Sequence, residues 1–333
     1  MSSTAAGLTW KLIEEARERI AGKVSVTPVL TSDTLDAHSG VQLYFKCENL
    51  QRGGAFKARG ATNAVFALTE TQAQRGVATH SSGNHAAALA RAARLRGITA
   101  HVVMPQNAPR AKRAAVASYG AEITWCAPTL AAREQAAAQV VAATGATLVH
   151  PNDDVMVMAG QATAAVELMS QAPALDVILC PVGGGGLLSG TAVAAKTLKP
   201  DIQVIGVEPS GADDAARSFR AGTLLPPAGP PNTIADGLRG ALGVKPFAEI
   251  RRLVDDIITV PDEAIVRAMR ELWEELRVIV EPSGAVAYAA LGSGAVTLRG
   301  KRIGVILSGG NLDLDHLPWS IDTQTRSSTT AIP

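Results

Sequence analysis

The sequence is poor in aromatic residues, in net charge and in cysteine, and each shortage excludes a class of protein. Aromatic side chains make up only 4% of the 333 residues, which argues against a surface that stacks nucleic-acid bases. The 31 basic and 30 acidic residues leave a net charge of +1, so we expect neither nucleic acid nor an anionic membrane as a partner. The cysteines are Cys47, Cys126 and Cys180, and their odd number and wide spacing argue against a disulfide framework or a cysteine zinc site.

Long apolar runs are also missing. No stretch approaches the roughly 18 uninterrupted apolar residues that a membrane-spanning helix needs. The N-terminal segment MSSTAAGLTWKLIEEARERI has no apolar core after a basic start, so no secretory signal is visible. We therefore expect a cytoplasmic protein with no membrane partner.

What the chain does contain is a regular alternation of short β-rich runs and longer alanine-rich segments. Strands are predicted at Gln42–Lys46, Val77–Thr79, Thr99–Met104, Glu122–Trp125, Val177–Pro181, Val204–Glu208 and Ile303–Leu307. Helices are predicted at Trp10–Ile20, Phe56–Leu68, Asn84–Leu95, Arg110–Tyr119, Leu130–Ala143, Ala159–Gln171, Leu187–Thr197 and Asp262–Leu276. This alternation predicts an α/β fold, in which a mainly parallel sheet is covered by helices on both faces.

A run of four glycines is the strongest chemical signal in the sequence. In VILCPVGGGGLLSG an apolar strand leads into Gly183, Gly184, Gly185 and Gly186, and a helix follows. Unobstructed backbone N–H groups and the positive end of a helix together form a cradle for an anion such as phosphate. The run is neither a GxGxxG fingerprint nor a Walker A loop, and a flexible or tight turn is the simpler alternative.

Three further polar segments adjoin predicted strands or helices, where ligands collect in an open α/β sheet. In ENLQRGGAFKARGA, Lys57 opens a helix; a deprotonated lysine can bond an aldehyde, although most lysines lie on the surface. In THSSGNH, the hydroxyls and amide between Ser81 and Asn84 can bind a carboxylate or simply cap a helix, and His85 alone favours a packed core residue. In LSGGN, Ser308 follows an apolar strand, and alone it indicates only a turn.

Taken together, AFKARG, SSGNH, GGGG and SGGN resemble the fold-type II pyridoxal-phosphate enzymes, specifically the threonine dehydratase and serine racemase branch. The resemblance covers roughly residues 10 to 318. It implies a tryptophan synthase β-like fold with two three-layer domains and mainly parallel sheets. The large cofactor-binding domain would comprise residues 1–71 and 152–320, the small substrate-side domain residues 72–151, and residues 321–333 a polar tail.

The resemblance also assigns expected roles to individual residues. Lys57 would carry the cofactor as a Schiff base, with Phe56 packed on the ring and the glycines at 183–186 around the phosphate. Asn84 and Asn152 would face the cofactor's hydroxyl side, and Ser308 would meet the pyridine nitrogen. Further candidates for substrate contact are Ser81, Ser82, Asn84, His85, Arg133 and Gly240.

A divalent cation is a further expectation from the racemase branch. In EPSGADD the matching positions are Glu208, the carbonyl of Ala212, and Asp214. Two carboxylates and a carbonyl suit a hard, oxygen-seeking ion such as Mg²⁺ or Ca²⁺. A solvated acidic turn is the simpler alternative.

The implied activity is a dehydratase that converts a 3-hydroxy amino acid of the threonine or serine type to a 2-oxo acid and ammonia. A racemase is the alternative, because Ser82 could protonate the face opposite Lys57, but dehydratases carry this serine too. A β-replacement synthase, a non-catalytic binding protein and a nicotinamide-dependent dehydrogenase are less favoured.

Departures from the branch's motifs bear on the substrate. Arg133 could meet a second carboxylate, as in 3-hydroxyaspartate, although a surface arginine is the simpler reading. Gly240 replaces a serine and would admit a bulkier substituent. Ala87 replaces a glutamine, which argues against nucleotide regulation of the racemase type. A homodimer is the expectation for this family, and the substrate is expected to be a small amino acid.

Overall fold

The computed structural model describes residues 7–81, 83–108, 110–172, 175–294, 296 and 298–319. Its strands form two sheets, a six-stranded sheet of order β1-β2-β10-β7-β8-β9 and a four-stranded sheet of order β5-β4-β3-β6. The strands are β1 Val29–Leu30, β2 Gln42–Cys47, β3 Val77–His80, β4 Ala100–Pro105, β5 Glu122–Cys126, β6 Thr147–Leu148, β7 Val177–Pro181, β8 Gln203–Pro209, β9 Asp256–Val260 and β10 Arg302–Leu307. Only the pair β1–β2 is antiparallel among these strand pairs of the described residues.

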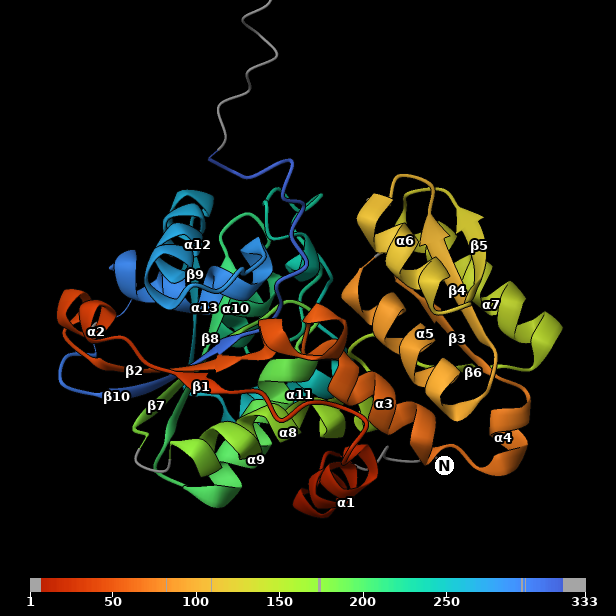
Figure 1. Cartoon of the computed structure of the whole chain (residues 1–333), viewed down its shortest axis with the longest axis horizontal. Helices are drawn as coiled ribbons and strands as arrows, with labels where there is room; N and C mark the ends of the chain where they lie inside the picture. Colours follow the sequence, from red (N-terminus) through yellow and green to blue (C-terminus); the bar gives the residue numbers. More distant parts are fainter. Residues whose placement is uncertain are drawn as a thin grey trace, which may run out of the picture.

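Helices cover both faces of each sheet (Figure 1). They are α1 Trp10–Ile20, α2 Asp33–Ser39, α3 Lys57–Ala67, α4 Glu70–Gln74, α5 Asn84–Arg96, α6 Arg110–Ser118, α7 Leu130–Thr144, α8 Val155–Gln171, α9 Gly186–Leu198, α10 Asp214–Ala221, α11 Val244–Leu253, α12 Asp262–Leu276 and α13 Pro282–Gly292. Alternate residues of β7 point to opposite faces: Leu179 packs in the core beneath α12 and α13, and Ile178 in the core beneath α8 and α9. This is the three-layer arrangement that the alternating sequence predicted.

The predicted α/β fold with mainly parallel sheets is therefore confirmed. The four-stranded sheet draws its strands from residues 77–148, and the six-stranded sheet draws its strands from both sides of that segment. The two sheets lie side by side in Figure 1, with α3 between them. The residue boundaries assigned above to two domains remain predictions, and the expected tail at 321–333 lies outside the described residues.

Some elements were not predicted from the sequence. The strands β1 and β6 have two residues each, too short to show a period. The strand β9 and five helices, α2, α4, α10, α11 and α13, were also missed. Helix α13 is buried along almost its whole length, so its sequence PSGAVAYAALG shows no polar face.

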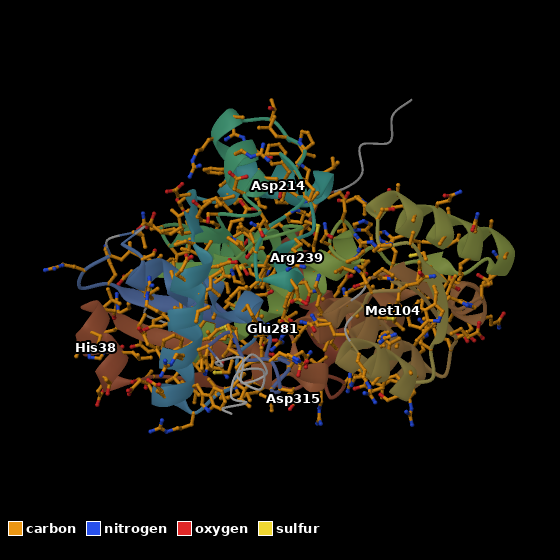
Figure 2. The ribbon with its side chains drawn as sticks, turned by 90° about the horizontal axis from the view of Figure 1, so that it is seen from above. His38, Met104, Asp214, Arg239, Glu281 and Asp315 are labelled. Atoms are coloured by element: carbon orange, nitrogen blue, oxygen red, sulfur yellow. The ribbon has the colours of Figure 1, made fainter. Side chains whose placement is uncertain are left out.

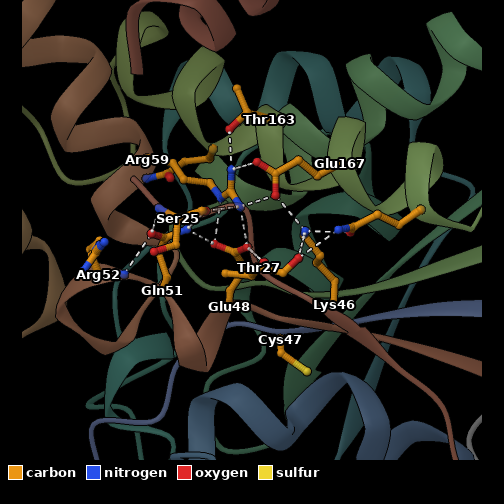
Figure 3. A network of polar contacts seen from close by, with 12 residues as sticks. Ser25, Thr27, Lys46, Cys47, Glu48, Gln51, Arg52, Arg59, Thr163 and Glu167 are labelled. Carbon is orange, nitrogen blue, oxygen red and sulfur yellow. Dashed lines mark hydrogen bonds and ion pairs between the residues drawn. The ribbon is translucent and has the colours of Figure 1, made fainter. Parts of the chain in front are cut away.

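Glycine packing brings α3 close to α8. A Cβ atom added to Gly160 of α8 would lie 2.5 Å from the Cα of Gly60 in α3, so only glycine allows this approach. Behind the contact, Arg59 pairs with Glu48 and Glu167, and Glu167 also pairs with Lys46 (Figure 3). The start of α3 is thereby fixed against both the sheet and α8.

No described helix is both long enough and apolar enough to cross a membrane.

Candidate active site

A cavity of about 370 Å³ lies at the carboxyl ends of strands from both sheets. Its walls include the start of α3, the turn after β3, residues 150–153, the glycine turn after β7, residues 236–238 and 240–244, and Ser308 after β10. Segments that are far apart in the sequence therefore meet here, as expected for the ligand site of an open parallel sheet.

Lys57 is the first residue of α3 and lines this cavity. Its Nζ donates a hydrogen bond of 2.7 Å to the carbonyl of Pro151 and lies 5.1 Å from the ring centroid of Phe56. Burial lowers the pKa of the amine to about 8. The amine is thus held in the cavity and is ready to lose its proton near neutral pH, which a surface lysine would not be.

The four glycines form the turn between β7 and α9 and line the same cavity. A Cβ added to Gly183 would lie 2.9 Å from the Cα of Leu238, and one on Gly184 would lie 2.3 Å from the Asn152 side chain. Gly185 has a φ of +85°, which disfavours any other residue. The turn ends at the N-terminus of the 13-residue helix α9, so it has the form of an anion cradle.

Asn152 lies against the glycine turn. Its Nδ2 donates a 2.8 Å hydrogen bond to the carbonyl of Gly184, and the residue lines the cavity. The structure thus brings Asn152 into the site, while its contact with the cofactor's hydroxyl side remains a prediction.

The turn after β3 brings Ser81, Asn84 and His85 to the cavity. The Oγ of Ser81 accepts a hydrogen bond from the Gly83 amide at 3.3 Å. His85 is buried, with Nε2 3.4 Å from the carbonyl of Val149, and burial holds its pKa well below the usual range. It is therefore a neutral packed histidine at the cavity wall. Ser82 lies outside the described residues.

Cationic and imidazole groups form another part of the wall. Arg133 of α7 and Lys112 of α6 line the cavity, and Lys112 pairs with Asp236 across it. His80 and His150 contact each other edge to face, with ring centroids 5.3 Å apart. Burial lowers the pKa of His150 to about 4 and also lowers that of His80, so both rings are neutral at physiological pH.

The two remaining residues predicted to contact the cofactor or the substrate are also at the cavity. Ser308 is 3% exposed, and its Oγ donates a 3.4 Å hydrogen bond to the carbonyl of Ser283. Gly240 lines the cavity, and a Cβ added to it would meet no atom within 4 Å. The wall therefore has free space at Gly240.

Four cavity residues were not predicted from the sequence: Glu281, Lys112, His150 and Asp236. All four line the cavity. Glu281 precedes Pro282 at the start of α13, a pattern typical of an ordinary helix start, and nothing in the sequence distinguished the other three from surface residues.

The predicted cation ligands lie together outside the cavity. Both carboxylate oxygens of Glu208 accept backbone hydrogen bonds, from Ala215 at 3.0 Å and from Ala216 at 2.8 Å. Asp214 accepts one from the Leu242 amide at 2.8 Å. Burial raises the pKa of Glu208 to about 8 and raises that of Asp214. Within the described ranges, no group of three or more His, Cys, Asp or Glu side chains is placed to hold a metal ion.

Comparison with known proteins identifies the class. The family model described as "Pyridoxal-phosphate dependent enzyme" matches residues 20–309, so this chain belongs to that family. The predicted resemblance to the threonine dehydratase and serine racemase branch of this family is thus confirmed.

Particular relatives are similar over nearly their whole length. A "beta-hydroxyaspartate dehydratase" of Paracoccus denitrificans (strain Pd 1222) is 49% identical over 312 residues, covering 94% of this chain and 99% of the relative. A "Serine racemase" of Arabidopsis thaliana is also 49% identical, covering 92% and 93%. The solved structure of maize serine racemase superposes with a TM-score of 0.91 at 47% identity, covering 93% of this chain and 95% of that one.

The residues present fit pyridoxal phosphate. The glycine cradle excludes side chains where a phosphate would lie, and the deprotonatable amine of Lys57 is in the same cavity. An anion site and an aldehyde-reactive amine are the two groups that this cofactor requires of a protein.

Proposed function

We propose that this chain is a pyridoxal-phosphate-dependent dehydratase (ammonia-lyase) that converts a 3-hydroxy amino acid to a 2-oxo acid and ammonia. We favour 3-hydroxyaspartate as the substrate over threonine or serine. The observation that carries the activity is the partly buried amine of Lys57, with its lowered pKa, in the same cavity as the glycine turn. The similarity to a dehydratase over 99% of that relative's length supports it.

Lys57, the glycine turn and Ser308 would hold the cofactor, with the glycine amides around its phosphate and the serine at its ring nitrogen. When bound, pyridoxal phosphate supplies an aldehyde for amines and a ring that accepts an electron pair. The Nζ of Lys57, with a pKa lowered to about 8 by burial, can take the proton from the substrate's Cα.

The preference for a dicarboxylic substrate rests on Arg133. It lines the cavity, and among the ion pairs of the described residues none joins a carboxylate to its guanidinium. A partly buried cation without a counter-ion favours an anionic ligand. Threonine and serine have no second carboxylate to offer it.

Amino-acid racemisation is the second candidate. It is supported by the similarity to the serine racemases of Arabidopsis and maize. It would need an acid on the face opposite Lys57, and Ser82 is the candidate. A β-replacement synthase is less favoured.

We also propose a divalent cation, Mg²⁺ or Ca²⁺, at Glu208, the carbonyl of Ala212, and Asp214. The support is the pair of buried carboxylates whose pKa values burial raises, because a cation would favour their ionised forms. We further propose a homodimer in the cytoplasm, which sedimentation of the purified protein and cell fractionation would test.

The test of the proposed function is a substrate panel with the cofactor-loaded protein. We expect 2-oxo acid and ammonia from 3-hydroxyaspartate, with slower release from threonine and serine. Arg133→Ala should lower kcat/KM for 3-hydroxyaspartate by roughly tenfold or more, because the substrate's second carboxylate loses a hydrogen bond from a charged group. The same variant should change the reaction of threonine far less.

The control is Arg75→Ala, which removes an exposed arginine away from the cavity and should leave both substrates unchanged. Inversion of serine without 2-oxo acid formation would favour the racemase instead. Equal losses for 3-hydroxyaspartate and threonine in Arg133→Ala would contradict the dicarboxylic assignment.

A further inference from the structure

Glu281 is a buried carboxylate of the cavity that the proposed chemistry does not use. Its residue is 2% exposed and lines the cavity directly before α13. Figure 2 labels it near the middle of the molecule, between His38 of α2 and Met104 of β4. Its backbone N–H donates to the carbonyl of Gly309 at 3.0 Å, so its position is fixed by the chain that follows β10.

Helix capping does not explain this residue. Glu281 occupies the N-cap position of α13, but its side chain makes no capping hydrogen bond. Instead its Oε1 accepts a hydrogen bond of 2.6 Å from the Nδ2 of Asn84, at the start of α5. Its Oε2 is buried and has no partner among the described residues. The carboxylate therefore points from α13 toward the opposite wall of the cavity.

The neighbouring glycine makes room for this contact. A Cβ added to Gly309 would lie 2.3 Å from the Oε1 of Glu281. The glycine after Ser308 thus allows the carboxylate to lie beside the end of β10. A buried ionisable group that requires such space is costly to keep, so a function is expected of it.

The contact fixes the amide of Asn84 at both ends. Its Nδ2 donates to Glu281, and its Oδ1 accepts from the Nδ2 of Asn311 at 2.9 Å. A carboxylate can only accept hydrogen bonds, so an ionised Glu281 requires the amide nitrogen on its own side. That nitrogen carries a second N–H, which is left for a ligand in the cavity that Asn84 lines.

Charged groups on both sides of the cavity affect the pKa of Glu281. Burial raises the pKa of Glu281 to about 7. The positive charge of Lys112 in α6 lowers this pKa, and the negative charge of Asp236, in the 3-10 helix Asp236–Leu238, raises it. The residues nearest to the carboxylate from the chain after β10 and from the start of α5 are Gly309 and Asn84, and both are uncharged. In the protonated form Glu281 can donate as well as accept, so the amide of Asn84 is no longer held in one orientation.

We propose that Glu281 is a positioning residue that orients the amide of Asn84 and so presents its free N–H to the bound cofactor. This inference rests on the proposed function, because it requires a cofactor in the cavity. Glu281 touches Asn84 and not the reacting atoms, so it acts through that amide.

The test compares Glu281→Gln, Glu281→Ala, Asn84→Ala and the double variant Asn84→Ala/Glu281→Ala as cofactor-loaded proteins. The readouts are kcat/KM and the visible absorbance of the cofactor between pH 5.5 and 9. Glu281→Ala should lower kcat/KM by about tenfold, because a hydrogen bond to a charged group is lost. Glu281→Gln keeps an acceptor oxygen and should stay within about threefold of wild type, but the absorbance change near pH 7 should disappear.

The double variant separates positioning from packing. If Glu281 acts through Asn84, the double variant should be no slower than Asn84→Ala alone. The control is Glu271→Gln. It removes the charge of a carboxylate that accepts a hydrogen bond from Tyr288 of α13 and does not line the cavity. This variant should leave kcat/KM and the spectrum unchanged.

Additive losses of kcat/KM in the double variant would overturn the inference, and so would a pH-dependent spectrum that persists in Glu281→Gln. Neither result would contradict the proposed function, because the wild-type protein would still be active. A wild-type protein with no visible cofactor band would instead overturn the proposed function itself.

Discussion

At the residue scale, the glycines after β7 differ in what they exclude. Gly183 faces the backbone of Leu238, Gly185 requires a left-handed conformation, and Gly184 faces the side chain of Asn152. A side chain at Gly184 would therefore displace Asn152, which also hydrogen-bonds the carbonyl of Gly184. Two neighbouring residues and one left-handed backbone conformation therefore define the shape of the anion cradle.

We predict that Gly184→Ala weakens the binding of pyridoxal phosphate by roughly tenfold or more, because overpacking of this kind typically costs about 1–3 kcal/mol. Titration of the apoprotein with the cofactor, followed by absorbance, measures the change. Gly229→Ala is the control, since a Cβ there meets no atom within 4 Å. Equal affinity in both variants would show that the turn does not surround the phosphate.

At the scale of elements, helix α3 carries Lys57 at its first position and is fixed by charges two residues further on. Arg59 is fully buried and pairs with Glu48 at 2.7 Å and with Glu167 at 2.7 Å (Figure 3). Burial alone would raise the pKa of Glu48, but the Arg59 guanidinium holds it below its usual value. The network thus keeps a buried carboxylate ionised and anchors the helix start to the segment after β2.

We predict that Arg59→Ala lowers the free energy of unfolding by about 3–5 kcal/mol, because Glu48 would be left as a buried charge without this partner. Denaturant unfolding monitored by circular dichroism measures the loss. Arg270→Ala breaks the exposed pair with Glu274 and should cost about 0–1 kcal/mol. A loss at Arg59 no larger than at Arg270 would mean that the network does not stabilise α3.

At the scale of the whole molecule, two buried carboxylates contribute in the same direction to the pH dependence of stability. Burial raises the pKa of Glu208 to about 8 and that of Glu281 to about 7, both above the ordinary value of 4.5. Between the ordinary and the raised values these two groups hold more protons in the folded protein than in the unfolded chain. Their contribution to stability therefore decreases as pH rises through this range. The histidines His80, His85 and His150 have lowered pKa values, so they contribute in the opposite direction below about pH 6.5. A cation at Glu208 would oppose the trend by binding the ionised form.

We predict that the melting temperature of the metal-free protein falls, relative to that of Glu208→Gln, as pH rises from 5 to 8.5, because this comparison isolates the contribution of the Glu208 carboxyl. Mg²⁺ should raise it more at pH 8.5 than at pH 6, since more Glu208 is then ionised. Thermal scans with Mg²⁺ and with EDTA measure both effects. Glu208→Gln should lose the Mg²⁺ response, and a response that survives this change would place the cation elsewhere.

Much of the architecture and of the site was predictable. The strand β7 and the helices α1 and α12 have the predicted bounds, because strong local patterns set them. Lys57, the glycine turn, Asn84 and Ser308 meet at one cavity, as their positions beside predicted strands and helices implied. The five missed helices and the short strands β1 and β6 lack such a pattern; α13, for example, is apolar on all sides.

The sequence by itself determined the order of strands and helices, the glycine turn and the lysine, because each depends on residues that are neighbours in the chain. Only the tertiary structure decided which groups share the cavity and in what charge state. Glu281 and Asn84 are separated by 197 positions, and Lys112 and Asp236 by 124. Burial and pairing of such distant groups arise when the sheets and helices pack, so the local sequence carries no signal for them.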